Sequence, residues 1–143
     1  MKVLFVGGTG TISASCSRLA VERGIELVHL NRGQRPTERL DGVRTITCDI
    51  NDEAAAADAL GDERFDAVVD FVVFTPDQVE RDLRLFADRA RQYVFISSAS
   101  VYQKPPLHPV ITESTPLCNP YWEYARNKIA CEERLNRAYR EQG

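Results

Sequence analysis

The chain has 143 residues, about the length of one domain, and its 43% hydrophobic and 27% charged residues are ordinary for a folded globular protein. Its net charge of −3 gives no electrostatic reason to expect a nucleic-acid partner. No apolar run approaches the roughly 20 residues that span a bilayer, and no signal peptide is recognisable, so we expect a cytoplasmic protein with no membrane partner. The four cysteines are far apart in sequence, which favours free thiols over a metal site.

Short apolar runs alternate with helical patterns along the chain. This alternation predicts a doubly wound parallel sheet with helices on both faces. The runs are rich in valine, isoleucine and phenylalanine and almost continuously apolar, as expected for strands covered on both sides. We expect strands at residues 2–6, 26–30, 44–48, 67–72 and 93–97.

The helices are indicated by the residues at their ends. In the first, Ile12, Cys16, Leu19 and Arg23 fall on one stripe, and Gly24 follows as a left-handed stop. The second helix is expected over residues 53–60, capped by Asp52. The fourth helix is expected over about residues 121–140. The third begins at TPDQ, residues 75–78, which combines an N-cap threonine, a proline and a capping glutamine, and should run to about residue 90.

Residues 101–120 form a proline-rich connection with one expected turn at 112–114. A loop of this length in a small domain is more often functional than idle.

The segment VGGTGTIS, residues 6–13, lies between the first predicted strand and the first predicted helix. A tight turn there needs glycine for its backbone angles, and a second glycine lets a pyrophosphate approach the amides at the helix N-terminus. Gly7 and Gly10 fit these two roles. Ser13 occupies the third position, which serves close packing, and we expect it to relax that packing without abolishing the site. A glycine-rich turn that binds nothing is the alternative interpretation.

The second predicted strand ends in LNRG, where an acidic residue would hold a ribose hydroxyl of NAD. No carboxylate is present, but Asn31 can bond a ribose hydroxyl and Arg32 can pair with a 2′-phosphate, which favours NADP over NAD. A solvated surface arginine is the alternative. Asp49 follows the third strand, where it could reach an adenine amino group or cap the next turn.

Tyr124 and Lys128 are four residues apart in the last predicted helix and therefore share one face. A free phenol ionises only near pH 10 or so, but a neighbouring ammonium favours the phenolate and permits proton transfer closer to neutral pH. Such a pair also arises by chance on helix surfaces. Here it follows the hydroxyl-rich end of the fifth strand, SSASVY, at the sheet edge where ligands bind.

The whole chain resembles the extended short-chain dehydrogenase/reductase family of NAD(P)-dependent epimerases and dehydratases, through VGGTGTIS, LNRG, CDI, DAVVDFVV, FISSASVYQ, ITESTP and YWEYARNK in that order. The resemblance implies a Rossmann fold and hydride transfer between a nicotinamide and a nucleotide sugar or similar small molecule. It implies that Tyr124 exchanges the hydroxyl proton, Lys128 holds the ribose and Ser98 steadies the substrate oxygen. The cofactor contacts that it implies are Gly7, Gly10, Thr11, Ile12, Asn31, Arg32, Asp49, Ile50, Phe71 and Val72.

The resemblance further implies that residues 1–143 are a truncated Rossmann domain, incomplete at its C-terminal side and without the family's substrate domain. We therefore expect weak cofactor binding, little or no turnover by this chain alone, and an unpaired edge at the fifth strand. Relatives commonly dimerise through the helix that carries the tyrosine and lysine, which implies a homodimer. Two alternatives stay open: a non-catalytic NAD(P) sensor or RNA- or protein-binding module of the same fold, and a nonfunctional truncated product.

Overall fold

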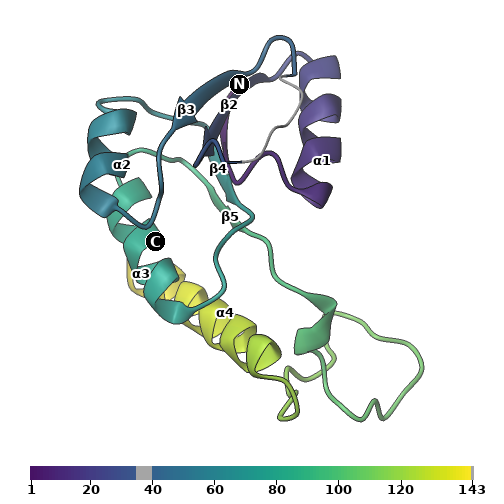
Figure 1. Cartoon of the computed structure of the whole chain (residues 1–143). Coiled ribbons are helices and arrows are strands. Elements are labelled where there is room, and N and C mark those ends of the chain that lie inside the picture. Colours follow the sequence, from purple (N-terminus) through teal and green to yellow (C-terminus); the bar gives the residue numbers. More distant parts are fainter. Residues whose placement is uncertain (35–39, 143) are drawn as a thin grey trace. The chain divides into compact units, whose positions relative to one another are not determined.

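The computed structural model describes residues 1–34 and 40–142, and it contains a five-stranded parallel sheet (Figure 1). The elements follow in the order β1 (Lys2–Val6), α1 (Thr11–Glu22), β2 (Glu26–Asn31), β3 (Arg44–Thr47), α2 (Glu53–Leu60), β4 (Ala67–Asp70), α3 (Pro76–Phe86), β5 (Tyr93–Phe95), a 3-10 helix η1 (Ala99–Val101) and α4 (Glu123–Gln142). The strand order is β3-β2-β1-β4-β5 with every pairing parallel. The predicted doubly wound parallel sheet is confirmed.

The order of the strands reverses direction at β1, with β2 and β3 on one side and β4 and β5 on the other. Because right-handed crossovers in opposite directions place their helices on opposite faces, α1 covers one face of the sheet and α2 the other (Figure 1). Val6 is paired with both Leu30 and Asp70, so the carboxyl ends of three strands reach the same edge. In open α/β sheets, the crevice beside such a reversal is where ligands bind.

Among the described residues, two hydrophobic clusters pack against the sheet. The larger contains side chains from the sheet and from α2 and α3, namely Leu4, Val6, Val28, Leu30, Ile46, Ile50, Ala56, Leu60, Phe65, Val68, Leu85 and Phe86. The smaller cluster lies under α1 and contains Val3, Phe5, Ala20 and Leu27. Successive residues of β1 alternate between the two clusters, as the pleat of a strand covered on both faces requires.

The buried face of α1 differs from the stripe expected from the sequence. Ile12 is 64% exposed and Leu19 is 48% exposed, whereas Ser13, Ser17 and Ala20 are buried. The small side chains allow the helix to lie close to the sheet, and both buried serine hydroxyls are hydrogen-bonded. The apolar stripe was therefore the wrong guide to the face that α1 packs against the sheet.

The predicted helix starts are confirmed where local hydrogen bonds set them. The Asp52 carboxylate accepts from the amide of Ala55 at 3.0 Å at the start of α2. The Gln78 side chain accepts from the amides of Phe74 and Thr75 at 2.6 and 3.2 Å at the start of α3. Two other helix boundaries agree less well with the expected ones. Helix α3 stops at Phe86 rather than near residue 90, and α4 begins at Glu123, two residues later than expected.

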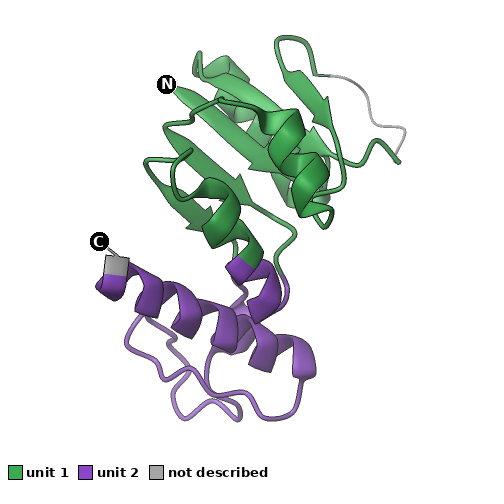
Figure 2. Cartoon of the chain, turned by 90° about the vertical axis from the view of Figure 1, so that its left-hand side faces the viewer, with its two compact units in different colours: residues 1–73, 81–96 green, residues 74–80, 97–143 purple. Residues whose placement is uncertain are grey.

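The chain divides into two compact units, which are coloured separately in Figure 2. Unit 1 consists of Met1–Val73 and Arg81–Ile96 and holds the sheet, while unit 2 consists of Phe74–Glu80 and Ser97–Gly143 and holds η1 and α4. No helix within residues 1–34 and 40–142 is long and apolar enough to cross a membrane.

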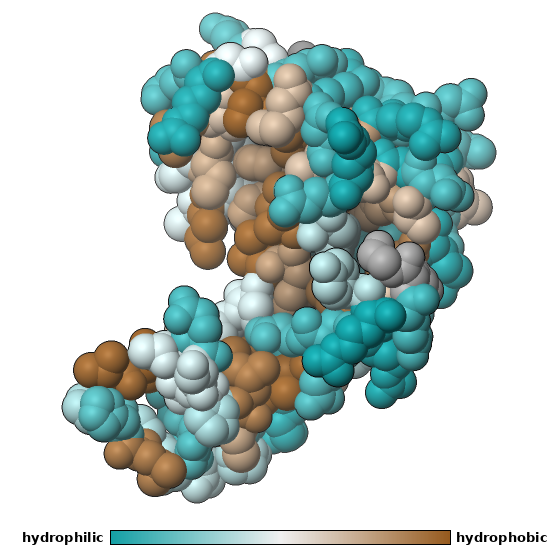
Figure 3. Space-filling view, turned by 180° about the vertical axis from the view of Figure 1, so that it is seen from behind, coloured by the Kyte–Doolittle hydropathy of each residue, from teal (hydrophilic) through white to brown (hydrophobic). Residues whose placement is uncertain are grey.

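The segment between η1 and α4 folds back on itself within unit 2. Tyr102 forms an antiparallel bridge with Leu117, and the expected turn is closed by a bond from the Thr115 amide to the Thr112 carbonyl oxygen at 2.9 Å. Hydrophobic side chains of this segment are visible as brown projections at the lower left of Figure 3.

Candidate functional site

The turn between β1 and α1 depends on two closely packed glycines. Gly7 has a φ of +79°, and its amide donates to the Leu30 carbonyl oxygen at 3.0 Å, which ties the turn to β2. A Cβ atom on Gly7 would lie 2.5 Å from Cγ1 of Val72, and one on Gly8 would lie 2.4 Å from Cδ2 of His29. A larger residue at either position would displace the turn.

Ser13 is buried at 1% exposure and connects two parts of this turn. Its Oγ accepts from the Gly10 amide at 2.8 Å and donates to the Gly7 carbonyl oxygen at 2.7 Å. The relaxed packing expected of a serine here stays a prediction, and the structure adds that its hydroxyl closes the turn from inside.

The N-terminus of α1 opens at the same turn. Gly10 is the N-cap, and the first intrahelical bond runs from the Ala14 amide to the Gly10 carbonyl oxygen at 2.9 Å. The amides of Thr11, Ile12 and Ser13 precede that bond, and amides in this position together with the helix dipole bind anions. The first turn of α1 has no acidic residue that would oppose an anion. The arrangement can therefore hold a pyrophosphate with backbone groups.

The ends of β2 and β3 carry the residues predicted to contact the adenosine. Asn31 is the last residue of β2 and pairs with Thr47 of β3, while Arg32 follows it and is exposed. Asp49 is exposed in the loop after β3. Ile50 belongs to the larger core cluster, so only its backbone can face a ligand.

Phe71 and Val72 follow β4 at the same edge of the sheet. The Phe71 amide donates to the Val6 carbonyl oxygen at 3.0 Å, and its ring meets the ring of Phe5 edge-on, with the centroids 5.2 Å apart. The Val72 amide donates to Oδ1 of the buried Asp70 at 2.5 Å. All ten predicted cofactor contacts lie in unit 1, at the end of β2 or on segments that follow β1, β2, β3 and β4.

The three predicted catalytic residues lie together in unit 2. On α4, Lys128 is only 2% exposed, and its Nζ is 5.8 Å from the ring centroid of Tyr124. The same Nζ is 5.0 Å from the ring centroid of Phe74. The Lys128 ammonium therefore lies within cation–π distance of two aromatic rings.

Ser98 is the N-cap of η1, which packs against α4. Its Oγ accepts from the Ser100 amide at 3.2 Å and lies 2.9 Å from the Ser100 hydroxyl. The buried Asn119 donates from Nδ2 to the Ser100 carbonyl oxygen at 2.8 Å and accepts from the Tyr121 amide at 3.2 Å. Asn119 therefore ties the turn that carries Ser98 to the chain that leads into α4.

A sequence model described as the NAD dependent epimerase/dehydratase family matches residues 3–143. The chain belongs to this family. The UDP-glucose 4-epimerase of Lactobacillus helveticus is 30% identical over 154 aligned residues, which cover 93% of this chain and 46% of that protein.

Solved structures share the fold. The UDP-Glc/GlcNAc 4-epimerase from Campylobacter jejuni has a TM-score of 0.86 at 21% identity, covering 99% of this chain and 50% of that one. The UDP-glucose 4-epimerase from Bifidobacterium longum, solved in complex with NAD+ and UDP, has a TM-score of 0.81 at 20% identity, with 99% and 50% coverage. The chain thus spans about half the length of these relatives.

Two aromatic side chains that lie beside Tyr124 were not predicted as site residues from the sequence. The ring centroid of Trp122 is 4.8 Å from that of Tyr124, and the centroid of Phe74 is 6.3 Å from it. Trp122 comes two residues before the tyrosine, a spacing that does not place side chains on one helix face, and Phe74 is distant in sequence. The cluster arises because Trp122 precedes the first turn of α4.

His29 and Ser17 contact the glycine turn and were also not predicted as site residues from the sequence. Nε2 of His29 lies 2.8 Å from Oγ of Ser17, and that hydroxyl is 3.3 Å from the Gly8 carbonyl oxygen. Burial lowers the pKa of His29, so its imidazole is neutral at pH 7. The sequence signal was a histidine inside an otherwise apolar strand.

Proposed function

We propose that this chain is the dinucleotide-binding part of an enzyme that transfers a hydride between NAD or NADP and a nucleotide sugar or a similar hydroxyl or keto compound. The observation that carries the proposal is the closed glycine turn at the N-terminus of α1, set at the reversal point of the sheet. Family membership and the NAD+ and UDP of the Bifidobacterium relative support it.

The chain's own groups fit such a ligand. The amides of Thr11 and Ile12 would bind the pyrophosphate, Asn31 and Arg32 would face the adenosine ribose, and Asp49 would accept from the adenine amino group. Arg32 favours a 2′-phosphate and hence NADP. When bound, the nicotinamide supplies the carbon that accepts and returns the hydride.

Unit 2 supplies the proton chemistry in this proposal. Tyr124 would take the hydroxyl proton as the substrate carbon is oxidised and would return it on reduction. In this proposal the Lys128 ammonium would hold the cofactor ribose, and the Ser98 hydroxyl would donate to the same substrate oxygen. The rings of Phe74 and Trp122 lie beside the phenol ring of Tyr124, with centroids 6.3 and 4.8 Å away.

Titration with NADH and NADPH, followed by nicotinamide fluorescence, tests the binding half of the proposal. The wild-type chain is expected to bind saturably, and Gly7→Ala should weaken binding at least about tenfold because its Cβ displaces the turn that receives the pyrophosphate. Gly24→Ala is the matched control, since Gly24 also has a positive φ, of +70°, but has open space around it. A folded wild-type chain that binds neither dinucleotide would contradict the proposal.

A further inference from the structure

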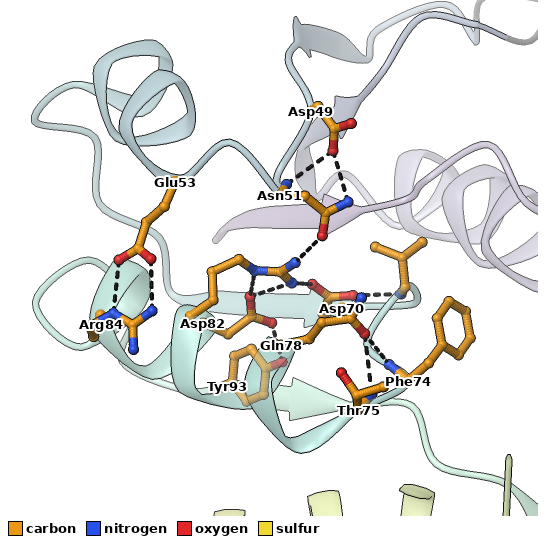
Figure 4. Close-up of polar contacts among 12 residues, drawn as sticks. Asp49, Asn51, Glu53, Asp70, Phe74, Thr75, Gln78, Asp82, Arg84 and Tyr93 are labelled. Carbon is orange, nitrogen blue, oxygen red and sulfur yellow. Dashed lines mark hydrogen bonds and ion pairs between the residues drawn. The ribbon is translucent and has the colours of Figure 1, made fainter. Parts of the chain in front are cut away.

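Arg81 lies within a buried polar network of unit 1, drawn around Asp70, Asp82 and Tyr93 in Figure 4. Its Nε donates to Oδ1 of Asp82 at 2.8 Å, and its Nη2 lies 2.7 Å from the same oxygen. The other Asp82 oxygen accepts from the Tyr93 hydroxyl at 2.6 Å. The guanidinium is therefore fixed in one orientation by α3 and β5.

The remaining terminal nitrogen of Arg81 points toward the predicted adenine site. Nη1 donates to Oδ1 of Asn51 at 2.8 Å. Asn51 in turn donates from its backbone amide and from Nδ2 to Oδ1 of Asp49, each at 3.0 Å. Both bonds end on Oδ1, so Oδ2 of Asp49 retains the capacity to accept from a further donor.

The chemistry of an amide makes this connection directional. Asn51 carries one acceptor oxygen and one donor nitrogen on the same side chain. Because a guanidinium can only donate, it selects the oxygen of Asn51, and the nitrogen must then face Asp49. A buried guanidinium is costly unless its N–H groups are paired, so the contact with Asn51 is strongly favoured. The buried cation thereby sets the orientation of two exposed side chains.

We propose that Arg81 is a positioning residue which, through Asn51, holds the Asp49 carboxylate ready to accept a hydrogen bond from the amino group of an adenine ring. The inference rests on the dinucleotide site proposed above and assigns to Arg81 and Asn51 the preference of that site for adenine over other purines.

The test compares NADH with reduced nicotinamide hypoxanthine dinucleotide, in which a carbonyl oxygen replaces the adenine amino group. The wild-type chain should bind NADH about tenfold more tightly, because a carboxylate facing that carbonyl oxygen loses its donor. Arg81→Met and Asn51→Ala should bring the ratio of the two affinities close to one by weakening NADH binding alone. Arg84→Met is the matched control, since Arg84 lies on the same helix but pairs with Glu53 at 2.9 and 2.8 Å; it should keep the wild-type ratio.

Each outcome separates the two proposals. A wild-type chain that binds both dinucleotides equally, or an Asn51→Ala variant that keeps the wild-type ratio, overturns the role of Arg81 and leaves the dinucleotide site standing. Equal weakening of both ligands in Asn51→Ala would indicate a general structural effect and also overturns it. Binding of neither ligand by folded wild-type protein overturns the proposed function itself. Because Asn51 is exposed, this variant decides the test even where Arg81→Met fails to fold by circular dichroism.

Discussion

Asp70 is a fully buried carboxyl group at the end of β4 whose surroundings oppose its ionisation. Burial is the main cause that raises the pKa of Asp70 well above its ordinary value of 3.8, and the charge of Asp82 raises it further. The Val72 amide and Arg81 act in the opposite direction without reversing the shift. Burial also raises the pKa of Tyr93, which keeps the phenol protonated as a donor to Asp82. The guanidinium of Arg81 lies near both carboxyl groups, 3.7 Å from Asp70 and 2.7 Å from Asp82.

Asp70→Asn should remove a pH-dependent loss of stability. In the wild-type protein the folded state retains the Asp70 proton while the unfolded state loses it, so stability falls as pH rises from about 4, by at most about 1.4 kcal/mol per pH unit for one proton. Asparagine resembles the protonated carboxyl, so the variant should gain stability relative to wild type over that range. Urea unfolding of both proteins at several pH values measures the difference, and a difference that does not change with pH would contradict the raised pKa.

The starts of α2 and α3 could be predicted from the sequence because the groups that form them are close neighbours along the chain. Asp52 at the start of α2 and Gln78 at the start of α3 bond amides no more than four residues away. The buried face of α1 could not be predicted, since it depends on how closely the helix approaches the sheet. The connection from Arg81 to Asp49 joins distant segments, so no local pattern indicated it.

Gln78→Ala should destabilise the protein by about 0.5 to 2 kcal/mol, the range for loss of a helix cap. The change removes the acceptor for the Phe74 and Thr75 amides, and Phe74 is the residue whose ring lies over Lys128. Gln78→Glu is the control, because it keeps the acceptor and adds a negative charge near the helix N-terminus, so it should match or exceed wild type. Urea denaturation midpoints measure both, and equal losses in the two variants would exclude the capping role.

At the scale of the whole molecule, the predicted binding residues fall in unit 1 and the predicted catalytic residues fall in unit 2. The parallel sheet could be predicted because alternating strands and helices with right-handed crossovers allow few topologies. The division into units could not, since it groups residues 74–80, which include the start of α3, with α4 across a long stretch of sequence. The roles of Ser98, Tyr124 and Lys128 stay predictions. Because these residues lie in a different unit from the predicted binding residues, a variant in unit 2 can be tested separately for turnover and for dinucleotide binding.

Tyr124→Phe should leave NADH affinity within about twofold of wild type, and in the whole enzyme proposed above it should lower the interconversion of a UDP-sugar at least about a hundredfold, since it removes only the proton-exchanging hydroxyl. Tyr121→Phe removes a hydroxyl from an exposed tyrosine three positions earlier and should alter neither. Fluorescence titration and chromatographic separation of the UDP-sugars provide the two measurements. A Tyr124→Phe variant that loses dinucleotide binding together with turnover would contradict this separation of roles.

The two hydrogen bonds of Ser13 bear on how a ligand would arrive. A loop that must order itself around its ligand loses conformational entropy at that moment, which weakens binding and slows association. In this chain the hydroxyl of Ser13 already spans the turn from Gly10 to Gly7. The turn is therefore held in shape by bonds of its own, and a dinucleotide binding there would lose less conformational entropy in ordering it. The Ser13 hydroxyl thus contributes to the preorganisation of the turn.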